Sequence, residues 1–291
     1  MRFFLLGPVL LFILSTVGCS TVRLSDLQSH GSVKPDKFYA KGDISFIGSR
    51  ILISANIHGE EKNYIFDTGA EASFIHKNKS SGKSVNVSSP LGETLEYGSE
   101  YIDSIKIMDI EFVDTFAVNG NRPVLSKEID NFGGLIGAPV INKANWLISF
   151  TENYIEFSDR SLIKYNYAEL NTTVKNGLKY IEIDIGGIKQ YAQIDLGSSA
   201  AILLPHNSKI AKALLQTNEY VVKRGTATTA TGKHKISAKV IPNQTVYLGK
   251  EEISHLDIIV TDVDEAIIGS DFFKGTSLYF DNSNDIVYLK K

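Results

Sequence analysis

The sequence predicts an all-β protein made of two similar lobes in one chain. From about residue 41 onward, most segments alternate apolar residues with small or polar ones, as half-buried strands do. An apolar strand that ends in Asp67-Thr-Gly-Ala returns later in the chain as a strand that ends in Asp195-Leu-Gly-Ser. Only residues 205–216 have clear helical spacing, with Pro205 near the start. We therefore expect two β lobes that pair with each other as an intramolecular pseudo-dimer.

Each of the two acids follows a predicted hairpin. Residues 51–57 alternate, turn at His58-Gly59-Glu60, and return through residues 63–66 into Asp67. Residues 180–185 do the same, turn at Gly186-Gly187, and return through residues 191–194 into Asp195. The passages align without a gap over about 25 residues, which makes them an internal repeat. Because carboxylates are rarely buried without a partner, we expect the two acids to pair with each other.

The repeat continues downstream of both acids. An apolar-apolar-Gly element follows Asp67 and ends at Gly137, and another follows Asp195 at nearly the same spacing and ends at Gly269. Between acid and element, each half has a Gly-containing hairpin, at 92–98 and 225–232, and then alternating strands. A last strand pair follows in each half, within 146–157 and 278–289. The predicted lobes are therefore residues 41–160 and 161–291.

The segment before residue 41 has a different character. Residues 1–18 have a basic start, an apolar run and small residues before Cys19, the layout of a secretory signal. Thr16-Val-Gly-Cys19 resembles a bacterial lipobox, although Thr16 replaces the usual Leu. The resemblance implies a lipid on Cys19, and Ser20 implies the outer membrane of the cell envelope, facing the periplasm. An ordinary cleaved signal with an incidental Cys19 is the alternative. Residues 19–40 are polar and are expected to be a tether.

Composition excludes several classes of partner and site. The chain has 30 basic and 33 acidic residues and a net charge of -3, so its charge gives no sign of a basic surface that would bind nucleic acid. The six His residues are scattered without the spacing of metal ligands, and Cys19 is the only cysteine. We therefore expect no metal and no cofactor.

Taken together, these motifs resemble the retropepsin-like aspartic proteases. The first half matches best, with Phe66-Asp-Thr-Gly-Ala70 and Leu135-Ile-Gly137, and the second half has Ile194-Asp-Leu-Gly-Ser198 and Ile267-Ile-Gly269. The resemblance covers nearly all of residues 45–291. It implies that Asp67 and Asp195 activate one water molecule to hydrolyse peptide bonds, sharing a proton because two adjacent carboxylates cannot both ionise. Both acids lie in one chain, so we expect a monomer.

The resemblance also implies roles for the residues beside each acid. Gly69 and Gly197 let the loops turn and approach the carboxylates. Thr68 hydrogen-bonds across to the other loop, and Leu196 departs from the family because it cannot. Ala70 is the usual retropepsin residue at its position. A hydroxyl at Ser198 is expected to bond the outer oxygen of the second carboxylate, as in pepsin-like enzymes.

The resemblance further implies two hairpins that close over an extended peptide or protein substrate. Tyr97 and residues 228–231 (Thr228 to Thr231) lie where these hairpins should cover it, although ordinary hairpin side chains are an equal alternative. Because of Leu196, two other functions remain open: a non-catalytic peptide-binding module, and a protease that is active only as a homodimer through Asp67.

Overall fold

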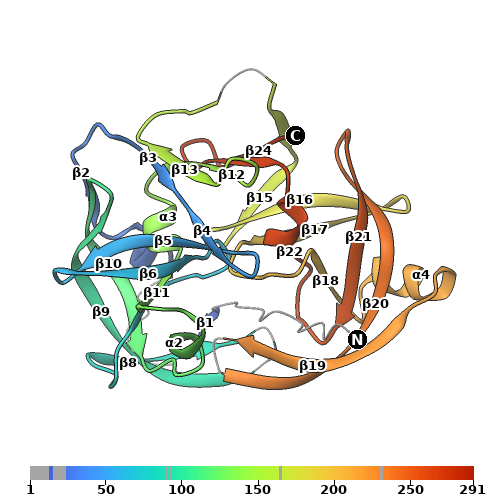
Figure 1. The fold of residues 1–291 in the computed structure, drawn as a ribbon, viewed down its shortest axis with the longest axis horizontal. Coiled ribbons are helices and arrows are strands. Elements are labelled where there is room, and N and C mark those ends of the chain that lie inside the picture. The colour runs from blue at the N-terminus through green and yellow to red at the C-terminus, as the bar shows by residue number, and fades with distance from the viewer. Residues whose placement is uncertain (1–12, 16–23, 90, 92, 164–165, 230–231) are drawn as a thin grey trace.

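The computed structural model describes residues 13–15, 24–89, 91, 93–163, 166–229 and 232–291. Most of the predicted signal segment and Cys19 lie outside this part of the chain. The described residues form an all-β fold with two lobes, as the alternating patterns predict (Figure 1).

The first lobe is built on a ten-stranded sheet. Its order is β1-β8-β9-β10-β7-β11-β6-β5-β4, with β2 paired to β10, and a further pairing of β9 with β5 closes part of the sheet on itself. The strands are β1 (Ile13–Ser15), β2 (Ser32–Lys34), β4 (Ser45–Ile47), β5 (Arg50–Ile57), β6 (Glu60–Phe66), β7 (Ser73–His76), β8 (Lys83–Ser88), β9 (Thr94–Ile107), β10 (Ile110–Gly120) and β11 (Phe132–Ile136).

The second lobe is built on an eight-stranded sheet. Its order is β15-β16-β17-β22-β18-β21-β20-β19, and β16 also pairs with β20. The strands are β15 (Thr172–Lys175), β16 (Leu178–Ile185), β17 (Ile188–Asp195), β18 (Ile202–Pro205), β19 (Val221–Thr229), β20 (Gly232–Leu248), β21 (Glu251–Thr261) and β22 (Ile267–Gly269).

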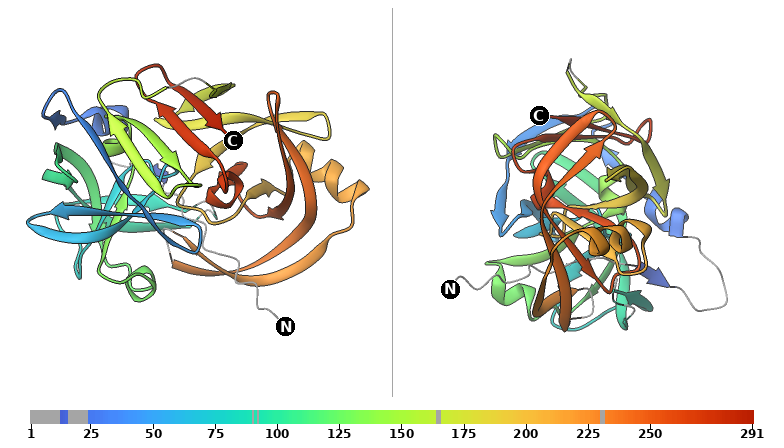
Figure 2. Two further views of the ribbon diagram at one scale, coloured as in Figure 1. Left: turned by 45° about the horizontal axis from the view of Figure 1, so that its top comes forward. Right: turned by 90° about the vertical axis from the view of Figure 1, so that its right-hand side faces the viewer.

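A six-stranded antiparallel sheet joins the lobes, and each half of the chain gives it three strands. Its order is β14-β24-β23-β12-β13-β3, and the halves meet where β12 pairs with β23. The strands are β3 (Tyr39–Asp43), β12 (Asn145–Ser149), β13 (Tyr154–Ser158), β14 (Ala168–Leu170), β23 (Ser277–Asp281) and β24 (Ile286–Lys290). Figures 1 and 2 show these strands gathered on one side of the molecule, across both lobes.

The two halves correspond strand by strand. β3 to β13 of the first half match β14 to β24 of the second in chain order, and each of the three sheets keeps the equivalent neighbours. β6 pairs in parallel with β11 just before Asp67, and β17 pairs in parallel with β22 just before Asp195. The repeat read in the sequence is therefore an approximate twofold repeat of the fold.

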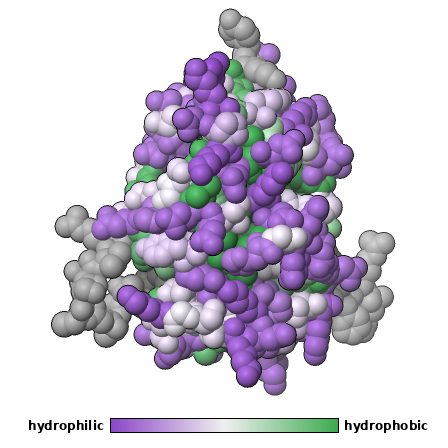
Figure 3. Space-filling view, turned by 90° about the vertical axis from the view of Figure 1, so that its left-hand side faces the viewer, coloured by the Kyte–Doolittle hydropathy of each residue, from purple (hydrophilic) through white to green (hydrophobic). Residues whose placement is uncertain are grey.

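The main core is continuous across the lobes. Trp146 is fully buried, stacks on Phe157 at 4.4 Å between ring centroids, and contacts Phe66, the residue before Asp67. One apolar cluster includes Phe66 of the first lobe and both Ile194 and Leu196 of the second. By contrast, the outer face of the first lobe is mostly polar, with small scattered apolar areas (Figure 3). The apolar residues are therefore concentrated in a core that holds the two acid loops together.

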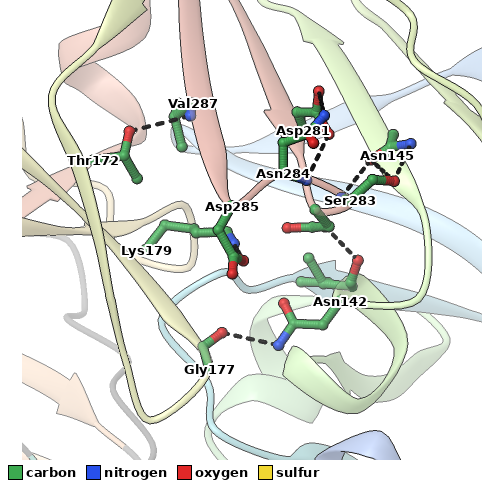
Figure 4. Close-up of polar contacts among 12 residues, drawn as sticks. Asn142, Asn145, Thr172, Gly177, Lys179, Asp281, Ser283, Asn284, Asp285 and Val287 are labelled. Carbon is green, nitrogen blue, oxygen red and sulfur yellow. Dashed lines mark hydrogen bonds and ion pairs between the residues drawn. The ribbon is translucent and has the colours of Figure 1, made fainter.

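Polar contacts reinforce the junction on the side of the six-stranded sheet (Figure 4). The side-chain amide of Asn142 donates to the Gly177 carbonyl at 2.9 Å, and that of Asn145 donates to the Ser283 hydroxyl at 3.1 Å. Lys179 forms an ion pair with Asp285.

Helices are few and short in the described residues. They are α1 (Leu24–Ser29), α2 (Leu125–Glu128), α3 (Ala138–Ile141), α4 (Lys209–Thr217) and the 3-10 turn η1 (Ser270–Phe273). The prediction of a helix over 205–216 is correct in type but wrong at its start. Pro205 ends β18 instead, and Ser208 caps α4 by accepting the Ala211 amide at 3.1 Å. None of the helices in the described part has the length and apolar character that a membrane crossing requires.

The segment expected to be a tether folds against the lobes from residue 24 onward. Gln28 of α1 is buried, and its side-chain amide donates to the carbonyls of Glu71 and Asn176, both at 2.9 Å. β2 adds to β10, and β3 adds to β13. The tether prediction is wrong for residues 24–40, because single buried side chains such as Gln28 and strand pairing at sheet edges leave no apolar period in the sequence.

Candidate functional site

The two acid loops meet at the centre of the molecule. Asp67 follows β6 and Asp195 ends β17, and an apolar-apolar-Gly element lies beside each. The amide of Asp67 donates to the Ile136 carbonyl at 2.9 Å. A Cβ added to Gly137 would lie 2.5 Å from the Ala72 carbonyl oxygen, and one added to Gly269 would lie 2.3 Å from that of Ala200. Only glycine at these two positions lets β11 and β22 lie this close to the acid loops.

The glycine after each acid is packed against the opposite carboxyl group. A Cβ on Gly69 would lie 2.5 Å from Cγ of Asp195, and a Cβ on Gly197 would lie 2.5 Å from Cγ of Asp67. Both carboxyl groups are fully buried, and each acid influences the pKa of the other, so the two lie side by side. The structure thus brings together the two acids that the repeat predicted to pair.

Each carboxyl group has one oxygen fixed by its own loop. Oδ1 of Asp67 accepts the Gly69 amide at 3.0 Å, and Oδ1 of Asp195 accepts the Ser198 amide at 3.1 Å. Oδ2 of each acid is buried and accepts no hydrogen bond from any described donor. In both halves, Oδ1 of the acid is therefore held by an amide of its own loop, and Oδ2 accepts no hydrogen bond from a described donor.

The environment favours the protonated form of both acids. Burial raises the pKa of Asp67 to about 7, against the opposing effect of the Gly69 amide. Burial, and after it the charge of Asp67, raise the pKa of Asp195 well above its ordinary value. Two carboxyl groups in contact titrate as a pair, so the pair retains a proton from acidic conditions up to near neutral pH.

Thr68 links the loops, whereas Leu196 packs in the core. The Thr68 hydroxyl donates to the Ile194 carbonyl at 2.8 Å and accepts the Leu196 amide at 3.0 Å. Leu196 is fully buried in the apolar cluster, and its carbonyl accepts the Ser270 hydroxyl at 2.7 Å. Only the first loop therefore supplies a hydroxyl that bonds across to the other loop. In the second loop, Leu196 contributes apolar packing instead.

Ala70 and Ser198 occupy equivalent buried positions in the two loops. The Ala70 carbonyl accepts the Ala138 amide, and the Ser198 carbonyl accepts the Ser270 amide, both at 2.9 Å. The expectation for the Ser198 hydroxyl is wrong, since its amide bonds Asp195 and its hydroxyl accepts the Ala200 amide at 3.4 Å. Oδ2 of Asp195 therefore accepts no hydrogen bond from the Ser198 hydroxyl.

Two hairpins cover the acids from the side opposite the six-stranded sheet. We call β8–β9 the first flap and β19–β20 the second flap; Figure 1 shows β19 reaching along the lower edge to the first lobe near α2. Tyr97 of the first flap and Thr228 and Thr229 of the second are buried, whereas Ala230 and Thr231 lie outside the described residues. Neither Asp67 nor Asp195 has any exposed surface.

The second flap is attached to the first lobe by polar contacts. Nη1 of Arg122 donates to the Thr229 carbonyl at 2.8 Å, and its guanidinium lies 4.7 Å from the centroid of the Phe74 ring. Side chains pair at the flap edge as well: His234 lies 3.1 Å from Glu93, and Lys233 forms an ion pair with Glu128 at 3.7 Å. These contacts join the second flap to the first lobe.

Arg50 and Arg122 are functional candidates that the sequence analysis missed. Both are about 5% exposed, burial lowers the pKa of each, to about 10 for Arg122, and the charge of Asp67 opposes that shift in both. A comparison of the halves could have shown Arg50, because Leu178 occupies the equivalent position in the hairpin before Asp195. Arg122 lies in the loop between β10 and β11, which is longer than the equivalent loop between β21 and β22, and it has no such signal. Two cations thus lie near one acid only.

Two cavities lie beneath the flaps, one against each lobe. The cavity of the second lobe has a volume of about 290 Å³ and includes Leu91 from the first flap tip in its wall. The cavity of the first lobe has a volume of about 190 Å³ and is bordered by Tyr97, Arg122 and the second flap tip at Thr229.

Within the described residues, no three His, Cys, Asp or Glu side chains come together as metal ligands would. A comparison with protein-family models gives no match for this sequence, and a comparison with curated proteins gives none either. The geometry of the acid pair and of its surroundings is therefore the basis for assigning a function.

Proposed function

We propose that this protein is a single-chain aspartic endopeptidase of the retropepsin-like kind, with Asp67 and Asp195 as its catalytic pair. The observation that carries the proposal is the close approach of two buried carboxyl groups, each packed against the glycine of the other loop. Burying two acids together is costly for a fold unless they share a proton, and that state is useful for hydrolysis. The twofold repeat of the sheets around the pair adds support.

The proposed reaction needs no covalent intermediate. One carboxylate takes a proton from a water molecule, which attacks the carbonyl carbon of the peptide bond, while the other carboxyl group gives its proton to the carbonyl oxygen. The resulting tetrahedral intermediate then collapses, the C–N bond breaks, and the amine leaves with a proton. Asp67 is the better candidate for the ionised partner, because the charges of Arg50 and Arg122 favour its ionised form.

The flap contacts bear on how a peptide would enter. Because both acids are fully buried and these contacts join the second flap to the first lobe, we expect the contacts of Arg122, Lys233 and His234 to open when a chain lies across the pair. An extended peptide would then add main-chain hydrogen bonds to the flap strands, as in other β-strand addition complexes. Flap opening of this kind is a frequent rate-limiting step.

The proposal is tested with three matched Asp→Asn variants. Purified wild-type protein is incubated with a peptide library, and products are identified by mass spectrometry. Asp67→Asn and Asp195→Asn should each reduce kcat at least 1,000-fold, an order of magnitude typical of catalytic groups that act as a unit. Asp103→Asn, on the exposed side of β9, should retain activity. Full cleavage by either dyad variant would refute the proposed pair.

A non-catalytic peptide-binding protein is the second candidate, favoured by the loss of one half of the loop link at Leu196. In that case wild-type protein binds a peptide with a reduced scissile bond but releases no products from the library. A protease that works only as a homodimer through Asp67 is a third case. This case predicts that Asp195→Asn keeps full activity. The close approach of the two acids within one chain favours the monomer instead.

We also propose attachment to the periplasmic face of the outer membrane through a lipid on Cys19. The support is the resemblance of residues 16–19 to a lipobox. Wild-type protein expressed in a Gram-negative host should incorporate labelled palmitate and fractionate with membranes. Cys19→Ala should lose the label, and label retained in that variant would exclude this attachment.

A further inference from the structure

The second flap has an unbalanced positive charge. Residues 220–250 include the whole of β19 and β20, and they contain six Lys or Arg residues but no Asp or Glu. The whole chain, by contrast, has a net charge of -3. The small overall charge therefore conceals a local excess of cations in this hairpin.

Four of these cations lie on one face of the hairpin. Directly opposed residues of an antiparallel strand pair share a face of the sheet, and every second residue along a strand returns to that face. The pairs on this face are Val222 with Lys239, Arg224 with Ser237, Thr226 with Lys235, and Thr228 with Lys233. The opposite face has Lys223, Ala227 and Ile236, which line the cavity of the second lobe. We call Val222 and the four cations that point away from that cavity the outer flap face: Arg224, Lys233, Lys235 and Lys239.

Acidic residues neutralise little of the outer flap face. Lys233 forms an ion pair with Glu128 at 3.7 Å, and the ammonium group of Lys239 lies 5.2 Å from the centroid of the Tyr220 ring. Arg224 and Lys235 are exposed, and neither forms an ion pair within the described part of the chain. The outer flap face can therefore accept an external anion without losing an internal ion pair at these two residues.

Apolar side chains lie beside the cations at the start of β19. Tyr220, Val221 and Val222 are consecutive and exposed, and Val222 belongs to the outer flap face itself. β19 is the edge strand of its sheet and runs along the lower edge of the molecule in Figure 1. Cations mixed with exposed apolar and aromatic side chains are typical of surfaces that bind anionic bilayers, where the cations meet lipid phosphates and the apolar groups enter the interface. A soluble polyanion would gain nothing from the apolar residues.

The proposed lipid on Cys19 would keep the folded body close to a bilayer. Leu24, where α1 begins, is only five residues after Cys19, and a chain of that length spans no more than about 18 Å. Residues 24–40 fold against the lobes, so they add nothing to this reach. Electrostatic attraction extends about 10 Å at 0.1 M salt, and it would select the face of the body that meets the lipid.

We propose that the outer flap face docks on an anionic phospholipid surface, with its Lys and Arg side chains on lipid phosphates and Val222 in the interface. The inference goes beyond the proposed peptidase activity and does not depend on it. The lipid on Cys19 supplies proximity, and the outer flap face supplies orientation. In this orientation the flaps face the bilayer, and the six-stranded sheet on the opposite side of the acids faces away from it (Figure 1).

A fluorescent probe at one residue tests the docking. Cys19 is the only cysteine, so Ser237→Cys adds one labelling site on the outer flap face. Thr173→Cys adds the control site, exposed on β15 at the other edge of the same sheet. Full-length protein is labelled with an environment-sensitive dye and mixed with vesicles of phosphatidylcholine, with or without phosphatidylglycerol. Protein without an added cysteine, treated with dye in the same way, gives the background.

The probe on Ser237→Cys should shift to shorter wavelength on the anionic vesicles and not on the neutral ones. The shift should be lost near 1 M salt, where the screening length falls to about 3 Å. The probe on Thr173→Cys should shift on neither. No shift on Ser237→Cys with anionic vesicles, or an equal shift at both sites, would overturn the docking.

Variants in the Ser237→Cys protein separate the contributions of charge and apolar contact. Arg224→Gln/Lys235→Gln should lower the ratio of docked to free protein about 25-fold, since each basic residue near an anionic surface contributes about fivefold. The matched control Lys37→Gln/Lys250→Gln removes two exposed cations outside the flap and should change the ratio little. Val222→Ser should weaken docking without changing its salt dependence. Equal losses in the two double variants would show that net charge, and not the outer flap face, drives the binding.

Soluble polyanions distinguish a bilayer from charge alone. Polyglutamate and double-stranded DNA are added at the same concentration of negative charge as the anionic vesicles. If either moves the probe as far as the vesicles do and Val222→Ser has no effect, the outer flap face is a site for a soluble polyanion and the proposal is overturned. No arm measures peptide cleavage, and the probe shift does not require a lipid on Cys19. A failure of docking is therefore distinguishable from a failure of the catalytic pair or of the lipid attachment.

Discussion

The hydroxyl of Thr68 holds the backbone of Leu196 in the opposite lobe, accepting its amide at 3.0 Å while donating to the Ile194 carbonyl at 2.8 Å. This contact joins the two acid loops through one side chain rather than two. Leu196 compensates by packing, since it is fully buried in the core that the lobes share. The two halves of the site are therefore held by different forces, a hydrogen-bond pair on one side and apolar contact on the other.

Thr68→Val is expected to lower the free energy of unfolding by about 1 to 3 kcal/mol, because it leaves a buried amide and a buried carbonyl without their partner. Urea unfolding followed by circular dichroism measures the loss. Thr173→Val, at an exposed position of β15, is the control and should change stability little. A Thr68→Val protein as stable as wild type would show that apolar packing alone holds the loops.

Gly197→Ala is expected to abolish cleavage while the fold persists, since the new Cβ would lie 2.5 Å from Cγ of Asp67 and must displace that carboxyl group. The same is expected of Gly69→Ala toward Asp195. Gly59→Ala controls for the loss of a glycine, because a Cβ there meets no atom within 4 Å although φ is +82°. Peptide cleavage and thermal unfolding are measured on all three. Normal activity of Gly197→Ala would contradict the close contact of the loops.

Stability should depend on pH through the acid pair. Because the folded-state pKa of both acids is raised, the folded protein holds a proton that the unfolded chain releases above about pH 4. This stabilisation is complete below the unfolded pKa and is lost as pH rises through the folded value, near 7 for Asp67. The unfolding free energy contributed by the pair should therefore fall by on the order of 1 kcal/mol per pH unit between pH 4 and 7.

The double variant Asp67→Asn/Asp195→Asn isolates this effect, because its amides do not titrate. Urea unfolding at several pH values should show a flatter profile for the double variant than for wild type or Asp103→Asn. Equal slopes in all three proteins would mean that the pair takes up no extra proton on folding.

Arg122→Gln is expected to loosen the second flap and to shift the pH profile of cleavage upward. The loss of the bond to Thr229 frees the flap tip, and the loss of a cation near Asp67 raises the pKa of that carboxyl further. Hydrogen exchange in residues 226–235 and kcat/KM against pH measure the two effects. Arg224→Gln, an exposed residue of the same flap, should change neither. An acid limb that does not move would show that Arg122 has no electrostatic role.

The sequence predicted much of the fold because strand pattern and repetition are local signals. Alternation predicted hairpins over residues 51–66 and 180–194, where β5 pairs with β6 and β16 pairs with β17, and the register of the repeat located both acids and both apolar-apolar-Gly elements. It also predicted the pairing of Asp67 with Asp195, since two acids at strand ends need a partner. The start of α4 and the role of residues 24–40 were wrong, because caps and edge strands depend on neighbours distant in the chain.

The sequence by itself determined that two equivalent acid loops exist and that Leu196 makes them unequal. Only the tertiary structure decided how that inequality is accommodated, by packing Leu196 in a core shared by both lobes and leaving Thr68 as the single polar link. It also decided that the charges of Arg50 and Arg122 act on Asp67, that both acids are fully buried, and that Arg122 joins the second flap to the first lobe. The physical reason is that electrostatic distance, burial and cavity volume arise between residues from different strands and lobes, and no local pattern records them.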